Sequence, residues 1–390
     1  ASPPISSPSP SPSPPPPPLG VTLFEMGRAA GGRTATRFTR DIPDLRVNHG
    51  APHFDVRDPR FSAVIGELEA GGFVGPVKGP CGVLQCAGDA QGAFQLSAPA
   101  PGAPLYAGTP SMNALCAGLL HLSGGGAECR YSTMVRGLEW IPGGGWRLFD
   151  KEQQPLGEFD WLAISSSGLC HPRWTKAFGG PPPMLEAAKA VGDPALDRAL
   201  ASIGGIYNRP VTAVMMAFGG DAAAAWGALP WAVAEVRGDD DIAKVMVERL
   251  DGGLVTVVVH STQAFSEKVV DVYGAKSTAA RVGGAGSSAE REAEVVEDLM
   301  RSLRRRLVPG LLPAAAFDAA PAWGAHLHRW GAAFPAEGGL PPGQAVAPDA
   351  RVVFMGDFVG GAPTGRVEDA AVSGLAAADA ILSHAAAPRM

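Results

Sequence analysis

The chain is poor in the features that mark several special classes of protein. Only five of its 390 residues are cysteine, no two of them form a C-x-x-C pair, and charged residues make up 18% of the total. A sparse, odd set of thiols excludes a disulfide-stapled secreted domain, so we expect reduced cysteines. Cys81 and Cys86 have no matching His or Cys pair, so we expect structural thiols there and no metal site.

Long apolar runs and a basic excess are also missing. Apolar runs such as Leu254–Val259 fall far short of the ~20 residues that a membrane helix needs. The 32 Lys and Arg residues face 38 Asp and Glu residues, a net charge of −6, so no basic face is indicated. We therefore expect no membrane span and no nucleic-acid partner.

The first eighteen residues are almost all Pro and Ser, without charge or amphipathic pattern. They resemble neither a secretory signal nor an Arg-rich transit peptide. We expect a disordered polyproline-type head over residues 1–20, with an SH3-type ligand as the functional alternative to a bare extension. The expected location is cytoplasmic or the interior of an organelle, chloroplasts included, and not secreted.

What the chain does have is 46% hydrophobic residues, enough for a sizeable core. Its length favours two domains, or one large α/β body with an inserted lobe. Short apolar runs predict strands, and apolar residues three or four apart predict helices. Expected strands are Val21–Glu25, Glu128–Val135, Gly137–Ile141, Gly145–Asp150, Phe159–Ser165, Val211–Phe218, Trp231–Val236, Leu254–His260 and Arg351–Met355. Expected helices are Asp58–Ala70, Ser111–Leu122 with Ser111 as N-cap, Ser288–Leu307 and Val367–Ser383.

These elements fall into two groups. The strands between residues 128 and 165 predict a small antiparallel meander, with a hairpin turn at Gly143–Gly145. Those between 171 and 335, with the long charged helix, predict an inserted sheet-plus-helix lobe. Residues 351–383 return to the pattern of the first segment.

The two ends of the chain share one pattern, in which a strand ends in an acid and a glycine-rich loop with an arginine follows. In a dinucleotide-binding fold, an acid at the end of the second strand accepts the two ribose hydroxyls, a role that fits Glu25. Gly31 and Gly32 would let the backbone approach a pyrophosphate, and Arg33 would supply a bidentate cation for it.

The run from Phe24 to Arg37, followed by His49-Gly50-Ala51-Pro52-His53-Phe54, resembles the renalase-like branch of the FAD-dependent amine oxidase superfamily. The strand-ending acid, the double-glycine arginine and the His-Gly-Ala-x-x-Phe stretch occur in that family in the same order. Near the C-terminus, Val353–Asp357 and Thr364–Leu375 look like the family's terminal flavin motif.

The resemblance implies an α/β (α+β overall) fold, in which an antiparallel-sheet-plus-helix substrate domain is inserted into a Rossmann-like FAD-binding domain. The FAD-binding parts would be 21–75, 116–170 and 336–390, and the substrate parts 76–115 and 171–335. It also implies FAD as the cofactor and an amine or an NAD(P)H-type reduced nicotinamide as the small-molecule substrate. FAD contacts are expected at Glu25, Gly31, Gly32, Arg33, Gly50, Ala51, His53, Val135, Gly356, Asp357, Arg366, Val367 and Glu368.

Catalytic residues are less defined. His53 and Trp330 are the candidates on the substrate side of the flavin, and His49 could face the ring as well. For each of them, ordinary packing or a satisfied polar contact is the alternative.

One expected unit of the family is not found. A strand, a G-x-G-x-x-G turn and a helix, roughly 30 residues together, should precede the strand at Val21. Only twenty residues do, and ten of the first eighteen are proline. The missing strand is expected between Val21–Glu25 and Val352–Met355. Either the sequence is a truncated or mis-joined version of an intact flavoprotein, or the protein has lost FAD, and the retained Glu25, Arg33 and Asp357 favour the first.

The leading hypothesis is therefore an FAD-dependent oxidoreductase that transfers hydride from its substrate to flavin, with O₂ reoxidation to H₂O₂. Two alternatives stay open. One is a non-catalytic scaffold or assembly subunit that kept the fold without FAD. The other is a flavin desaturase of an apolar substrate.

Overall fold

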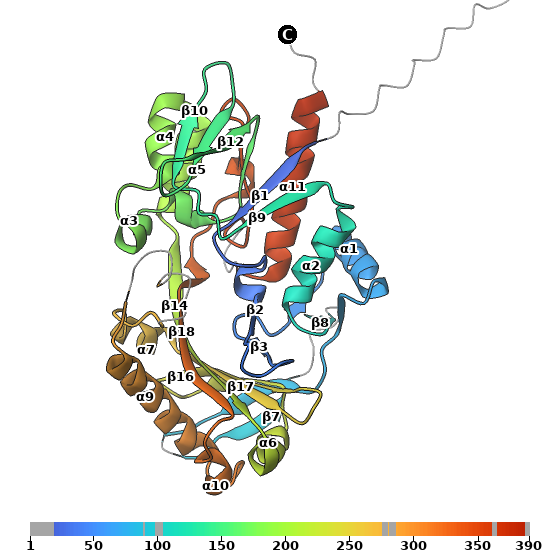
Figure 1. Ribbon diagram of the computed structural model, residues 1–390, viewed down its shortest axis with the longest axis vertical. Helices are drawn as coiled ribbons and strands as arrows, with labels where there is room; N and C mark the ends of the chain where they lie inside the picture. The colour runs from blue at the N-terminus through green and yellow to red at the C-terminus, as the bar shows by residue number, and fades with distance from the viewer. Residues whose placement is uncertain are drawn as a thin grey trace, which may run out of the picture.

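The computed structural model describes residues 19–88, 90–97, 104–274, 280, 286–360 and 365–386. The Pro/Ser-rich head, residues 1–18, lies outside the described residues. The described chain forms two lobes (Figure 1), with α11 (Val367–Ala386) running through the upper lobe and a large sheet forming the lower one.

The lower lobe is a seven-stranded, mainly antiparallel sheet in the order β18-β14-β17-β16-β15-β6-β7. Its strands are β6 (Cys81–Gln85), β7 (Ala93–Leu96), β14 (Tyr207–Phe218), β15 (Val233–Arg237), β16 (Ile242–Arg249), β17 (Val255–Ser261) and β18 (Trp323–Glu337). Four helices share a hydrophobic core with this sheet: α6 (Gly220–Gly227), α7 (Gln263–Lys268), α9 (Ala289–Leu307) and α10 (Ala314–Phe317). The predicted sheet-plus-helix lobe is therefore confirmed.

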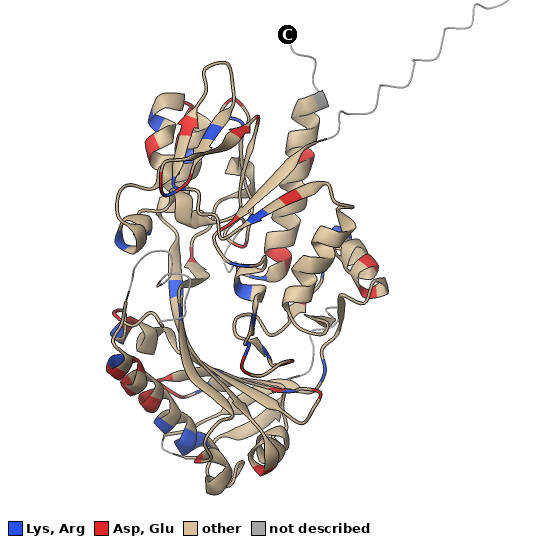
Figure 2. Cartoon of the chain, viewed as in Figure 1, with Lys and Arg blue, Asp and Glu red and all other residues tan. Residues whose placement is uncertain are grey.

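The long charged helix α9 forms where the sequence predicts it and buries the predicted apolar stripe. Ser288 caps it by accepting a hydrogen bond from the Arg291 amide. The stripe Val295, Leu299, Leu303 and Leu307 is fully buried against the sheet. Figure 2 shows charges of both signs along the helix, at the lower left, and few on the neighbouring strands of the sheet.

The opposite face of this sheet points toward the upper lobe. Because side chains alternate along a strand, Ala213, Met215 and Ala217 of β14 lie on this face. They pack with Val258 and with Val47 of β3 (Arg46–Asn48). This face is therefore covered by the N-terminal segment that carries the predicted site.

The upper lobe contains two small sheets with parallel pairs. In one, β1 (Val21–Glu25) pairs in parallel with β9 (Ala127–Tyr131). In the other, β20 (Val352–Phe354) pairs in parallel with β13 (Leu162–Ile164) and antiparallel with β19 (Val346–Ala347). Parallel strands bring their carboxyl ends to one edge, the usual place of a ligand site in α/β folds.

This pairing corrects the expected position of the missing strand. The strand β20 is occupied on both edges, so no strand can be inserted between it and β1 without displacing β13 or β19. Within the described residues, the strands that keep one edge without a partner in these two sheets are β1, β9, β13 and β19. An additional strand between the two sheets would therefore have to pair with one of these free edges, such as those of β1 and β13, and not with β20.

The predicted meander over 128–165 is correct only in its middle. The antiparallel sheet consists of β10 (Gly137–Trp140), β11 (Trp146–Phe149) and β12 (Pro155–Phe159), with the hairpin turn at Gly143–Gly145 between the first two. The flanking strands β9 and β13 belong to the parallel pairs instead, because their partners come from distant parts of the chain.

The remaining elements surround these sheets. They are η1 (Gly32–Thr34), β2 (Thr36–Phe38), β3 (Arg46–Asn48), β4 (Phe54–Asp55), α1 (Pro59–Ala70), β5 (Val74–Pro76), β8 (Leu105–Gly108), α2 (Asn113–Leu122), η2 (Ser167–Cys170), α3 (Arg173–Phe178), α4 (Pro183–Val191), α5 (Pro194–Gly204) and η3 (Pro342–Gln344). Asp58 caps α1 through the amides of Arg60 and Phe61. Ser111 does not cap α2, because its hydroxyl bonds the Asn113 side chain.

All five cysteines are free thiols, as expected. Within the part of the chain that the structure describes, no helix is long and apolar enough to cross a bilayer. In the same described ranges, no cluster of three or more His, Cys, Asp or Glu residues could hold a metal ion.

Candidate functional site

The two ends of the chain meet in an ion pair. Arg33 Nη1 lies 2.5 Å from Asp357 Oδ2, and Arg33 Nη2 lies 2.6 Å from Asp357 Oδ1. This bidentate contact joins residues 324 positions apart in the sequence. Planar fork-to-fork pairing of this kind fixes both the position and the orientation of a guanidinium.

The backbone around Arg33 explains its position. Gly31 and Gly32 adopt positive φ values of 136° and 52°, which glycine adopts without strain. The Ala51 amide then donates to the Arg33 carbonyl oxygen at 2.8 Å. A Cβ on Gly50 would lie 2.1 Å from that same oxygen, so only glycine allows this approach. Gly50 and Ala51 thus hold the Arg33 backbone in place.

The C-terminal part of β18 completes the surroundings of Arg33. The guanidinium donates to the Ala333 carbonyl oxygen and lies 5.9 Å above the Phe334 ring. A Cβ on Gly365 would lie 3.2 Å from the Pro335 ring. The lower-lobe strand β18 therefore reaches the point where the two terminal motifs meet.

Asp357 follows a tight turn at the end of β20. Gly356 has a φ of 118°, and its amide donates to Ser373 Oγ of α11 at 2.9 Å. A Cβ at Gly356 would lie 2.8 Å from the Ser165 carbonyl oxygen, which follows β13. The ends of β13 and β20 therefore lie against each other, and Asp357 projects from this junction.

Glu25 ends β1, where its carboxylate accepts a hydrogen bond from the Gly27 amide. Parallel pairing with β9 brings in the segment after Tyr131, and the Thr133 amide donates to the Glu25 carbonyl oxygen at 3.0 Å. Within the described residues, nothing hydrogen-bonds the amide or carbonyl of Val135. The pairing thus places a strand-ending acid beside a segment with free backbone groups.

Cys116 contacts the arginine loop and lies within electrostatic range of Glu25. Its thiol lies 3.5 Å from the hydroxyl of Thr34, the residue after Arg33. Burial raises the pKa of Cys116, and the nearby Glu25 charge raises it further. Glu25 and Arg33 therefore share one region of the upper lobe.

Charged side chains at the start of α11 form ion pairs with one another and with Asp55. Arg366 lies 3.3 Å from Asp55, 3.1 Å from Glu368 and 2.9 Å from Asp369. The buried Glu368 carboxylate also accepts hydrogen bonds from the amides of Arg57 and Asp58. Val367 packs on the core around α1. In this arrangement the side chains of Arg366 and Glu368 tie α11 to the 55–58 loop.

A buried cluster of imidazoles lies between the lobes. The His49 ring is 4.9 Å from His328 and 5.2 Å from Trp330, and Trp330 Nε1 donates to the His49 carbonyl oxygen at 3.2 Å. His260 of β17 bonds the same oxygen at 3.0 Å. Within the described residues, the Nδ1 atoms of His49 and His328 have no hydrogen-bond partner.

Burial keeps this cluster neutral. It lowers the pKa of His49 to about 4 and that of His260 to about 3, helped by the charges of Arg37 and Lys244 respectively. Burial also lowers the pKa of His328 well below its usual value. The pKa of His53 is lowered by burial and by Lys244. Trp330 is packed into this cluster.

Sequence reasoning missed three buried polar groups near these residues. His260 and Glu248 lie on β17 and β16, and Asn48 Nδ2 donates to Glu248 Oε2 at 2.9 Å. Burial raises the pKa of Glu248 to about 7. Arg173, at the start of α3, is the third. No local pattern marks these positions, because their burial depends on packing between elements far apart in the chain.

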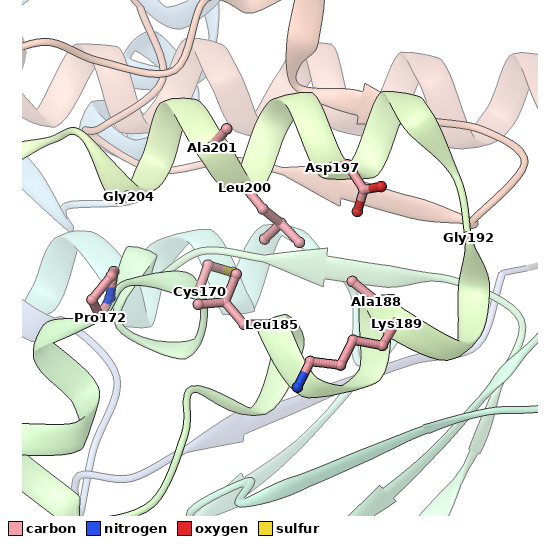
Figure 3. A pocket seen from close by; sticks show the side chains of 10 residues that line it. All are labelled: Cys170, Pro172, Leu185, Ala188, Lys189, Gly192, Asp197, Leu200, Ala201 and Gly204. Atoms are coloured by element: carbon pink, nitrogen blue, oxygen red, sulfur yellow. The ribbon is translucent and has the colours of Figure 1, made fainter.

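A separate hollow of about 490 Å³ lies between α4 and α5 (Figure 3). Its walls are mostly apolar, with Lys189 and Asp197 at its sides. None of the predicted site residues lines it. We therefore place the candidate site at the carboxyl ends of β1, β13 and β20 instead.

No family model and no curated protein matches the sequence. Solved structures do match. A proposed protoporphyrinogen oxidase from Exiguobacterium sp. 255-15 matches with a TM-score of 0.58 at 11% identity, over 94% of this chain and 93% of that one. Wild-type putrescine oxidase bound to putrescine matches with a TM-score of 0.55 at 11% identity, over 92% of each chain. The A394C-A396T-Q431G triple mutant of putrescine oxidase matches with a TM-score of 0.53 at 12% identity, over 92% of this chain and 93% of that one. The chain therefore has the mixed α/β fold of these oxidases.

Proposed function

We propose that this chain binds FAD and works as an amine-oxidase-type oxidoreductase with a renalase-like substrate, an amine or a reduced nicotinamide. The observation that carries the proposal is the Arg33–Asp357 pair, which joins the two terminal motifs at one edge of the parallel strands. The fold shared with putrescine oxidase, whose redesigned variants concern cofactor binding, supports it.

The residues present fit a dinucleotide of this kind. A Cβ added to Gly32 would have no neighbouring atom within 4 Å, and the same holds for Gly374 of α11. Open space therefore lies beside both glycines. Glu25 offers a carboxylate and Val135 offers a free amide and carbonyl, the groups that a ribose and an adenine edge require. Arg33 supplies the cation for a diphosphate.

When bound, the flavin supplies the hydride-accepting chemistry of the reaction. With FAD bound, Glu25 would hold the ribose hydroxyls, and Arg33, oriented by Asp357, would neutralise phosphate charge. Three aromatic rings pack together where the face of the large sheet toward the upper lobe meets the 49–51 loop. They belong to His49, His328 and Trp330. Because their pKa values are lowered, the two imidazoles contribute hydrogen-bonding nitrogens without charge near neutral pH.

The first test is uptake of FAD by the purified protein. We expect visible flavin absorption that an amine or a reduced nicotinamide bleaches without oxygen, and H₂O₂ formation in air. Bleaching only by an apolar polyene or porphyrinogen would favour the desaturase alternative. A folded, colourless protein that takes up no added FAD would contradict the proposal and favour the non-catalytic scaffold.

Replacing the strand-ending acid should weaken FAD binding. We expect Glu25→Ala to lower FAD affinity by about 10- to 100-fold, because a charge-assisted pair of hydrogen bonds contributes about 1–3 kcal/mol. Titration by quenching of flavin fluorescence measures this. Glu128→Ala is the matched control, since Glu128 lies on the paired strand β9 and is exposed beside Arg130. Equal affinities in the two variants would show that Glu25 does not contact the ribose.

A further inference from the structure

The backbone and one guanidinium nitrogen of Arg173 are hydrogen-bonded to neighbouring residues, whereas another guanidinium nitrogen has no acceptor within the described residues. Its backbone amide donates to His171 Nδ1 at 3.0 Å, and His171 Nε2 bonds the Ile206 carbonyl oxygen at 3.0 Å. Its Nη2 donates to the buried Ser167 Oγ at 2.8 Å. Its Nη1 is buried and has no hydrogen-bond partner within the described residues. The guanidinium is therefore held at one end and unsatisfied at the other.

The charges around Arg173 are those of the candidate site. Burial lowers its pKa to about 10, with Arg33 lowering it and Asp357 raising it, so both groups are close enough to act on it. Ser167 follows β13, whose end lies against the Gly356–Asp357 turn. Of these three groups, two guanidiniums are positive and one carboxylate is negative, and the carboxylate is already paired with Arg33. The three together therefore carry an excess positive charge.

Within the described residues, Arg46 and Arg329 each leave a buried Nε without a partner, whereas the guanidinium of the almost fully buried Arg306 is paired on several sides. Arg306 lies 2.6 Å from Asp239 and donates to the carbonyl oxygens of Gly88 and Ala90 at 2.6 and 2.9 Å. A buried charged donor without a partner destabilises the folded state, because it has lost its hydration without gaining an acceptor. An anion between the two guanidiniums would remove this destabilisation at Arg173 and balance the excess charge.

We propose that Arg173 is a second anion-binding residue, which together with Arg33 holds the two phosphate groups of a diphosphate. That this diphosphate belongs to FAD rests on the function proposed above. In this role Arg173 supplies donors from the β13 side of the site, opposite the loop that carries Arg33.

The test compares ligands with and without phosphate on Arg173→Met. We expect the affinity for FAD to fall by about 10- to 100-fold, while the affinity for riboflavin, which has no phosphate, stays unchanged. Inorganic pyrophosphate should compete with FAD in the unchanged protein and fail to compete in the variant. Arg173→Lys, which keeps the charge but not the fork, should recover part of the FAD affinity. Lys176→Met removes one exposed charge from the same helix and should change none of these values.

The outcomes separate the two proposals. An equal loss of FAD and riboflavin affinity, or no loss at all, would overturn the role of Arg173 without contradicting the proposed function. If the unchanged protein binds no FAD but pyrophosphate raises its unfolding temperature, and Arg173→Met abolishes this shift, the anion site stands and the proposed function fails. If pyrophosphate raises the unfolding temperature of both proteins equally, or of neither, the anion site fails.

Discussion

Gly50→Ala is expected to destabilise the protein by about 3 kcal/mol or more. The added Cβ would lie 2.1 Å from the Arg33 carbonyl oxygen and 3.1 Å from the Arg33 Cα, so backbone has to move. Overpacking against backbone is costly, and here it also breaks the hydrogen bond from Ala51 to Arg33. Urea unfolding followed by circular dichroism measures the change.

The same substitution in α11 is the control. Gly374→Ala places a Cβ where no atom lies within 4 Å, and alanine favours a helix by up to about 1 kcal/mol over glycine. We expect a neutral or slightly stabilising effect on unfolding. If both glycine variants unfold at the same urea concentration, the close contact between the 49–51 loop and Arg33 is wrong.

The second large effect is a loss of stability in acid. The folded pKa values of His49 and His260, about 4 and about 3, lie below the ordinary value of 6.5, and that of His328 is lowered as well. Between about pH 6.5 and 4, the unfolded chain therefore binds more protons than the folded one. The free energy of unfolding falls as the pH falls through this window, by on the order of 3 kcal/mol for His49 alone.

Glu248 acts in the opposite direction. Its pKa is raised from 4.5 to about 7, so the folded chain binds the extra proton between these values and gains stability as the pH falls. Three lowered imidazoles outweigh one raised carboxyl, so the net slope favours unfolding in acid.

Variants separate the imidazole contribution from general acid unfolding. His49→Gln removes the titrating group and keeps a hydrogen-bonding side chain, so its unfolding free energy should depend less steeply on pH between 6.5 and 4. His121→Gln, at an exposed position on α2, should follow the unchanged protein. Urea unfolding at a series of pH values supplies the slopes. Parallel slopes for all three proteins would mean that His49 is solvated or charged in the folded state.

Local patterns predicted most elements but missed some strands. The helix Ala289–Leu307 was predictable because its apolar stripe and Ser288 cap are both local. The strand Ile242–Arg249 was not expected, because Lys244 and Glu248 interrupt its apolar run on the face toward the upper lobe. The 15-residue strand β18 was also not recognised, because it contains His and Arg residues and its pairing with β14 shifts register.

The site shows the same division. The strand-ending acid and the glycine-arginine loop are local patterns, and the sequence alone indicated Glu25, Arg33 and Asp357. That Arg33 pairs with Asp357 was not predictable, since each was expected to contact the cofactor separately. The unsatisfied end of Arg173 has no sequence pattern at all.

By itself, the sequence determined which segments are strands or helices where cap and periodicity agree, and which residues have the chemistry to hold a dinucleotide. Only the tertiary structure decided that β20 is covered on both edges, that three histidines are buried together, and that Arg33 pairs with Asp357. The physical reason is the separation along the chain over which each effect acts. Backbone preferences and burial periodicity act over a few residues, whereas side-chain pairing and desolvation depend on which distant segments the fold brings into contact.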